Sequence, residues 1–149
     1  MRYNIVIKII KIVILYLINL LVIKNDHYLK KYDINTYKEK NYYSHIKSTL
    51  IELKDIDGIF VSSDLIAAQV IQVCNELKIR ISEDIQLVGF DDVDIATLTT
   101  PTITTIHQPI KEMATLAIEL IEKKNKGLEV IKNTILPIEL IIRNSTINR

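Results

Sequence analysis

The chain has 149 residues, of which 48% are apolar and 25% charged, and its formal net charge is +1. This length suits a single domain that buries most of its apolar surface, and three glycines and three prolines are too few for a collagen-like, linker-like or disordered chain. The near-neutral charge lacks the electrostatic footprint of a free-standing nucleic-acid binder. The single cysteine, Cys74, excludes an internal disulfide framework and a cysteine-based zinc site, and it fits a cytoplasmic protein.

Residues 1–32 differ in composition from the rest of the chain. They use only ten residue types and contain no Ala, Gly, Pro, Ser, Thr or Glu. Their Ile, Lys, Asn and Tyr residues have codons rich in A and T, so out-of-frame translation of AT-rich DNA would produce such a segment. We therefore interpret residues 1–32 as an atypical segment of uncertain status behind a truncated or frameshifted start, with a buried strand or helix, an export signal and a membrane segment as alternatives.

The apolar run Tyr3–Ile23 does not fit a membrane span. Lys8 and Lys11 interrupt it, and the uncharged part, Ile12–Ile23, is too short for the roughly 20 residues that a transmembrane helix needs. A signal peptide would require a small-residue cleavage site, and none follows. We therefore expect packing as strand or helix and no membrane anchor.

Regular patterns begin near residue 42. The first is a helix with Ser44 as N-cap, and the segment Gly58–Val61 reads as a short buried strand. The turn Ser62-Ser63-Asp64 then leads into a helix with one apolar stripe. The residues on that stripe are Ile66, Val70, Val73, Cys74 and Leu77. Because Cys74 lies on the stripe, it is predicted to be a core thiol.

The second half of the chain repeats the alternation of strand and helix. Strands are predicted at 85–90 and 103–107, and Pro109 opens a helix that Gly127 can terminate. That helix has an apolar face of its own, formed by Ile110, Met113, Ala114, Ala117, Leu120 and Ile121. A last β-rich run, 135–143, is interrupted by Pro137, which predicts an edge strand.

This alternation predicts an α/β fold with a parallel sheet. Ligands of such sheets bind outside the carboxyl ends of the strands, where Ser62-Ser63-Asp64 and Asp91-Asp92 lie. We expect Ser63 and Asp91 to emerge at the same edge and to accept hydrogen bonds from a polyhydroxylated ligand. Helix capping by Asp64 and loop capping by Asp92 are the structural alternatives.

Four segments, in order, resemble the effector domains of LacI/GalR-type bacterial transcriptional repressors. They are Gly58–Ala68, Ile79–Asp92, Pro101–Pro109 and Leu136–Thr146. The resemblance implies a periplasmic-binding-protein-like fold of type I, with a sugar or similar small metabolite as effector in a cleft between two subdomains. It assigns effector binding to Asp91 and to Ser63, which stands where the family often has Asn. It also implies a homodimer, with Ile66, Val70, Val73 and Cys74 as the expected contact.

The resemblance also divides the chain. It implies an incomplete domain, mainly the C-terminal subdomain, with effector-binding residues in 33–108 and a crossover helix and C-terminal strands in 109–149. The helix from Pro109 would belong to the other subdomain and would lose its packing partner. Nothing resembles a helix-turn-helix headpiece, so operator DNA would be bound only through a headpiece absent here.

The predicted function is an effector-sensing domain fragment of a LacI-type regulator, and the alternative is an exported sugar-binding protein of the same fold. An enzyme is not expected, because no Gly-x-Ser-x-Gly elbow accompanies Ser62, Ser63, Asp91 and His107. His107 is predicted to be a packed or rim residue. No glycine-rich phosphate loop or metal-ligand spacing is present, so neither a cofactor nor a metal is expected.

Overall fold

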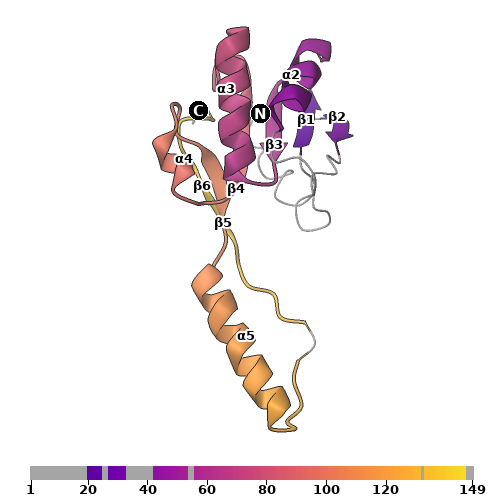
Figure 1. Ribbon diagram of the computed structural model, residues 1–149, viewed down its shortest axis with the longest axis vertical. Helices are drawn as coiled ribbons and strands as arrows, with labels where there is room; N and C mark the ends of the chain where they lie inside the picture. The colour runs from indigo at the N-terminus through magenta and orange to yellow at the C-terminus, as the bar shows by residue number, and fades with distance from the viewer. Residues whose placement is uncertain (1–19, 25–26, 33–41, 54–55, 132, 147–149) are drawn as a thin grey trace.

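The computed structural model describes residues 20–24, 27–32, 42–53, 56–131 and 133–146 (Figure 1). These residues form one six-stranded sheet of order β2-β1-β3-β4-β5-β6 and four helices. The strands are β1 (Leu20–Lys24), β2 (His27–Tyr32), β3 (Gly58–Val61), β4 (Gln86–Asp91), β5 (Thr104–His107) and β6 (Glu139–Ile141). The helices are α2 (Tyr43–Glu52), α3 (Asp64–Leu77), α4 (Ile95–Leu98) and α5 (Ile110–Asn125).

The centre of the sheet is parallel and its flanks are antiparallel. Strand β4 lies parallel to both β3 and β5, as predicted for this part of the chain. Strand β1 runs antiparallel to β2 and β3, and β6 runs antiparallel to β5. The prediction of a parallel sheet therefore holds for the three central strands only. Strand β6 occupies the edge that Pro137 predicted, and it is antiparallel because the chain returns to β5 from its far end.

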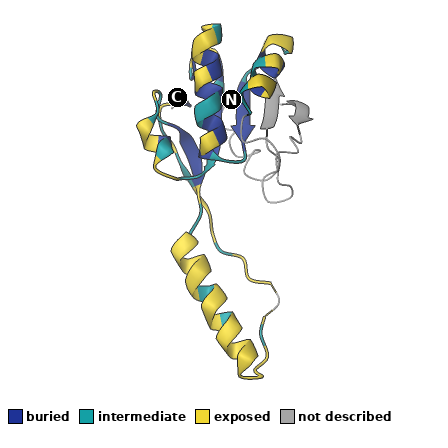
Figure 2. Ribbon diagram, in the orientation of Figure 1, coloured by how far each residue is buried: buried dark blue, intermediate teal, exposed yellow. Residues whose placement is uncertain are grey.

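Helices α2, α3 and α4 pack together beside the sheet and enclose one apolar core (Figures 1 and 2). Successive side chains along a strand point to opposite faces of the sheet. Ile59, Val61 and Leu87 belong to the core under the helices. Phe60 and Val88 are buried on the other face, where Phe60 meets Phe90 edge-on with ring centroids 6.5 Å apart.

Helix α3 buries the apolar stripe that its sequence predicts. Ile66 is 4% exposed, and Val70, Val73 and Cys74 are 0% exposed. The proposal that these four side chains form a dimer contact is therefore wrong, because they already pack inside their own chain. The outward face of α3 carries other residues, among them Leu65, which is 59% exposed.

Helix α5 extends away from the rest of the molecule on two chain segments (Figure 1). Pro109 is its N-cap and Gly127 adopts the expected left-handed conformation, with φ of 71°. None of its residues is buried (Figure 2), although its sequence contains the predicted apolar residues. Among the described residues α5 therefore has no packing partner.

Two predictions near the start of the chain meet the structure only in part. Residues 1–19 lie outside the described residues, whereas residues 20–24 and 27–32 form strands, in line with the strand alternative. Within the described part of the chain, no helix is long and apolar enough to cross a membrane. Ser44 is not the N-cap of α2, because the helix already begins at Tyr43 and Tyr42 occupies the cap position.

Candidate effector site

The polar residues after β3 and β4 emerge at the same edge of the sheet, as predicted. Strands β3 and β4 are parallel, with Phe60 opposite Val88, so residues 62–64 and 91–93 continue from the same end of the sheet. The two loops also touch, because the Val93 amide donates a 3.0 Å hydrogen bond to Asp64. The structure thus brings Ser63 and Asp91 to one site on adjacent strand ends.

Asp91 lies at the centre of this edge in an unusual backbone conformation. Its φ is 101° and that of Asp92 is 56°, so two successive residues adopt left-handed angles that L-amino acids rarely occupy. Such strain typically costs about 1–3 kcal/mol per residue and is concentrated at functional sites. The Asp91 carboxylate is half-buried, and its Oδ1 accepts a 2.7 Å hydrogen bond from Gln108 Nε2. Its other oxygen can accept a ligand hydroxyl.

Ser63 has a structural role in this conformation. It is the N-cap of α3, and its Oγ accepts a 3.3 Å hydrogen bond from the Ile66 amide. The hydroxyl proton can still be donated to a ligand, because capping uses only an acceptor lone pair. The assignment of Ser63 to effector binding stays a prediction.

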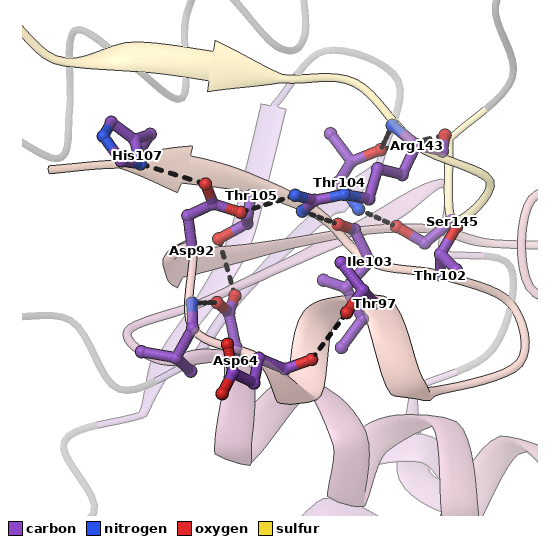
Figure 3. A network of polar contacts seen from close by, with 12 residues as sticks. Asp64, Asp92, Thr97, Thr102, Ile103, Thr104, Thr105, His107, Arg143 and Ser145 are labelled. Carbon is purple, nitrogen blue, oxygen red and sulfur yellow. Dashed lines mark hydrogen bonds and ion pairs between the residues drawn. The ribbon is translucent and has the colours of Figure 1, made fainter.

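Asp64 is a buried carboxylate between the two loops (Figure 3). Its Oδ1 accepts a 2.6 Å hydrogen bond from Thr105 Oγ1, and its Oδ2 accepts the bond from the Val93 amide. Burial raises the pKa of Asp64, the two hydrogen bonds oppose that rise, and the negative charges of Asp91 and Asp92 add to it. The sequence indicated only helix capping for Asp64, but the N-cap of α3 is Ser63.

Asp92 joins two residues from distant parts of the chain (Figure 3). Its Oδ1 accepts a 2.6 Å bond from Arg143 Nη2, and its Oδ2 lies 2.9 Å from His107 Nδ1. Partial burial raises the pKa of Asp92, but the hydrogen bonds and charges of Arg143 and His107 outweigh it, so the net pKa lies below its usual value. Arg143 also donates to the Ile103 carbonyl at 2.9 Å. Asp92 therefore anchors its loop, in agreement with the alternative of loop capping.

The segment after β6 fastens to the start of the central strands. Ser145 Oγ donates to the Leu87 carbonyl at 2.6 Å and accepts from the Thr104 amide at 2.8 Å. The Thr104 and Thr146 hydroxyls are 2.8 Å apart, and all these polar side chains are buried. This segment holds Arg143 in place, so residues more than 40 positions apart cooperate at the site.

Sequence reasoning missed Gln108 and Arg143. Gln108 follows the end of β5, so the strand-end rule that selected Ser63 and Asp91 would have selected it too. Arg143 has no such local signal, because its pairing with Asp92 depends on how β6 returns to the sheet. Within the described ranges, no group of His, Cys, Asp and Glu could hold a metal ion. The site offers carboxylate, amide and hydroxyl groups, which are suited to hydrogen-bonding ligand hydroxyls.

A mixed α/β sheet with polar residues gathered at its strand ends has the architecture of a ligand-binding domain, because ligands of open α/β sheets bind outside the carboxyl ends of the strands. The model of the periplasmic binding protein-like domain family matches residues 22–146, and the chain belongs to that family.

Two curated relatives illustrate its place in the family. The chain is 36% identical over 93 residues to the ribose operon repressor of Halalkalibacterium halodurans, an alignment that covers 61% of this chain and 28% of the relative. It is 34% identical over 112 residues to the HTH-type transcriptional regulator MalR of Clostridium butyricum, covering 75% of this chain and 33% of that protein. The chain thus spans about a third or less of the length of these relatives.

A solved structure agrees with this assignment. A periplasmic binding protein/LacI transcriptional regulator from Alkaliphilus metalliredigens, complexed with D-xylulofuranose, superimposes with a TM-score of 0.59 at 34% identity. The match covers 78% of this chain and 40% of that one. The predicted resemblance to LacI-type effector domains is confirmed, and so is the periplasmic-binding-protein-like fold.

Proposed function

We propose that this chain forms one wall of a sugar-binding effector site in a LacI-type transcriptional regulator, with Asp91 as the main effector contact. The observation that carries the proposal is the Asp91 carboxylate, held by Gln108 at the carboxyl edge of the parallel strands. A carboxylate there can accept hydrogen bonds from sugar hydroxyls, each charge-assisted bond being worth roughly 1.5–3 kcal/mol. Ser63, on the neighbouring strand end, is the second proposed contact.

The comparisons support a sugar as the effector class. One relative is a repressor of a ribose operon, and one structural neighbour was solved with D-xylulofuranose. Both names concern sugars, whose hydroxyls suit the donors and acceptors at the site. The relatives are regulators rather than enzymes, which agrees with a binding role for Asp91.

The proposed mechanism is a population shift. An effector that contacts Asp91 on this wall and a second wall on the other subdomain favours the closed arrangement, and closure changes the affinity for operator DNA by linkage. Gln108 and Pro109 lie where the chain leaves β5 for α5, so closure would change the conformation of the chain at these residues. The regulator would act in the cytoplasm as a homodimer. Because Ile66, Val70, Val73 and Cys74 are buried, the exposed side of α3 is the proposed dimer contact in their place.

The test requires a complete cleft. In a chimera, residues 56–146 of this chain replace the matching part of the Halalkalibacterium ribose repressor. Calorimetry then measures the binding of pentoses and hexoses to the chimera. We expect Asp91→Asn to weaken binding by about ten- to a hundredfold, at 1.4 kcal/mol per decade. No binding of any sugar by a folded chimera would contradict the proposal.

The matched control is Asp94→Asn. Asp94 is exposed in the same loop, so the substitution removes the same charge without disturbing a buried partner. Asp92→Asn is less suitable, although its sequence position first suggested it, because Asp92 anchors Arg143. Equal affinity of the Asp91→Asn chimera and its parent would overturn the assignment of Asp91.

A further inference from the structure

The left-handed turn at Asp91 and Asp92 is tied to the buried carboxylate of Asp64. The residue directly after the turn, Val93, donates its amide to Asp64 Oδ2 at 3.0 Å. Asp64 is 0% exposed, so water does not compete for this hydrogen bond. The bond fixes the position at which the chain leaves the turn, and it therefore opposes relaxation of the turn to ordinary backbone angles.

A second bond fixes the carboxylate itself. Thr105, fully buried in β5, donates its hydroxyl to Asp64 Oδ1 at 2.6 Å. Asp64 therefore links three neighbouring segments, namely the start of α3, the loop after β4 and strand β5. Helix capping does not account for this arrangement, because Ser63 caps α3.

Gly89 shows that space has been left for this carboxylate. A Cβ at Gly89 would lie 2.2 Å from Asp64 Oδ1 and 3.1 Å from Ile103 Cγ2. Any side chain at position 89 would displace the Asp64 carboxylate, so the glycine is required by the close approach. Gly89 lies in β4 two residues before Asp91, on the same strand that delivers the proposed effector contact.

We propose that Asp64 is a positioning residue of the effector site, which acts through the Val93 amide to hold Asp91 in its binding conformation. The inference rests on the proposed function for its effect on sugar binding, whereas the hold on the turn can be measured without any sugar. Asp64 itself is buried behind the turn and does not touch the ligand. Its contribution to affinity must therefore pass through Asp91.

The first measurement is amide hydrogen exchange in the full 149-residue chain, followed by NMR. Asp64→Ala removes the acceptor of the Val93 amide, and we expect exchange at Val93 to accelerate by about tenfold or more. Asp64→Asn should leave the rate within about threefold, because its amide oxygen can accept from Val93 and its NH₂ can donate to Thr105. Asp94→Asn is the control and should have no effect on Val93.

Gly89→Ala provides an independent variant should Asp64→Ala fail to fold. It leaves the carboxylate in the chain but forces it away from its present position. We expect faster exchange at Val93 and shifted backbone resonances of Asp91 and Asp92, in the same direction as for Asp64→Ala. Unchanged exchange and unchanged resonances in a folded Asp64→Ala or Gly89→Ala variant would overturn the proposal.

The second measurement is calorimetric titration of the ribose-repressor chimera, carrying the same substitutions, with ribose and xylulose, because sugar binding requires a complete cleft. Asp64→Ala should reduce the affinity about tenfold, Asp64→Asn should restore it, and Asp64→Ala should add nothing in an Asp91→Asn background. Equal losses in both backgrounds would overturn a role through Asp91. If the parent chimera binds neither sugar while exchange at Val93 in the 149-residue chain responds as expected, the proposed effector is wrong and the hold on the turn stands.

Discussion

Helices α3 and α5 have similar sequence patterns and opposite environments. They contain 14 and 16 residues, and each has an apolar stripe at helical spacing. Seven residues of α3 are buried, whereas no residue of α5 is (Figure 2). The apolar period of a helix thus predicts which face would pack, but it does not say whether this chain supplies the partner.

The difference follows from the strands on either side of each helix. Helix α3 connects β3 to β4, two parallel neighbours, so the crossover lays it on the sheet. Helix α5 connects β5 to β6, which are antiparallel, and extended residues after Gly127 bring the chain back to the edge. No sheet face is therefore positioned beneath α5 in the described structure.

The strongest test of this comparison introduces one charge into each helix. Val70 in α3 is 0% exposed, and Val70→Asp should destabilise the fold by about 4 kcal/mol or more, because the buried carboxylate has no partner. Ile118 in α5 is 60% exposed, and Ile118→Asp should change the free energy of unfolding by about 0.5 kcal/mol or less. Urea unfolding of both variants measures the two values, and similar losses would show that α5 is packed in solution.

Thiol reactivity sharpens the same contrast. Burial raises the pKa of Cys74 to about 12. The fraction of this thiol present as the reactive thiolate at neutral pH is therefore lower than that of an exposed thiol by a factor on the order of a thousand. Cys74 should react with a thiol reagent such as DTNB only as fast as the fold opens. In a Cys74→Ala background, Ala117→Cys places a thiol on exposed α5 and should react at the rate of a free peptide. Rapid labelling of the native Cys74 would contradict its burial.

Shortening one isoleucine in each helix tests the packing alone. Ile66→Ala in α3 should cost about 3 kcal/mol, since it removes buried methyl groups and leaves a cavity. Ile121→Ala in α5, where the side chain is 59% exposed, should cost less than about 0.5 kcal/mol. Thermal unfolding monitored by circular dichroism supplies both differences. A loss at Ile121 as large as that at Ile66 would refute the contrast.

The smallest expected effect concerns two ion pairs, of which the Asp92 pair should depend on pH. Because the folded-state pKa of Asp92 lies below its unfolded value of about 3.9, its stabilisation is present above that pH and is lost as pH falls through the folded pKa. Asp92→Asn should remove this part of the acid slope and cost about 1–3 kcal/mol at pH 7.

The pair of Glu122 and Lys126 in α5 is the control. These groups are 3.9 Å apart and exposed, and such pairs contribute about 0–1 kcal/mol. Glu122→Gln should therefore change the free energy of unfolding at pH 7 by about 1 kcal/mol or less. An acid slope unaffected by Asp92→Asn would show that the pair with Arg143 does not stabilise the fold.

Several features of the site could be predicted because they depend on local sequence. Strand β3 was predicted at its observed bounds, since three apolar residues stand between the break at Asp57-Gly58 and a serine turn. Ser63 and Asp91 were placed at one edge because parallel strands end together. The burial of Cys74 followed from its place on the α3 stripe.

The remaining features depend on contacts between distant residues. The same stripe suggested a dimer contact at Ile66, Val70, Val73 and Cys74, but a period cannot distinguish a partner subunit from the chain's own sheet. The antiparallel β6 and the Arg143–Asp92 pair, 51 positions apart, arise only when the chain returns from α5.

The sequence by itself determined the helix and strand periods, the order of the elements and the polar residues at the strand ends, because each depends on neighbours a few residues away. The tertiary structure decided which apolar faces are covered and which carboxylates are paired. It placed Asp64 between Thr105 and Val93 and required glycine at position 89, since the space around a buried carboxylate is set by all the segments packed against it.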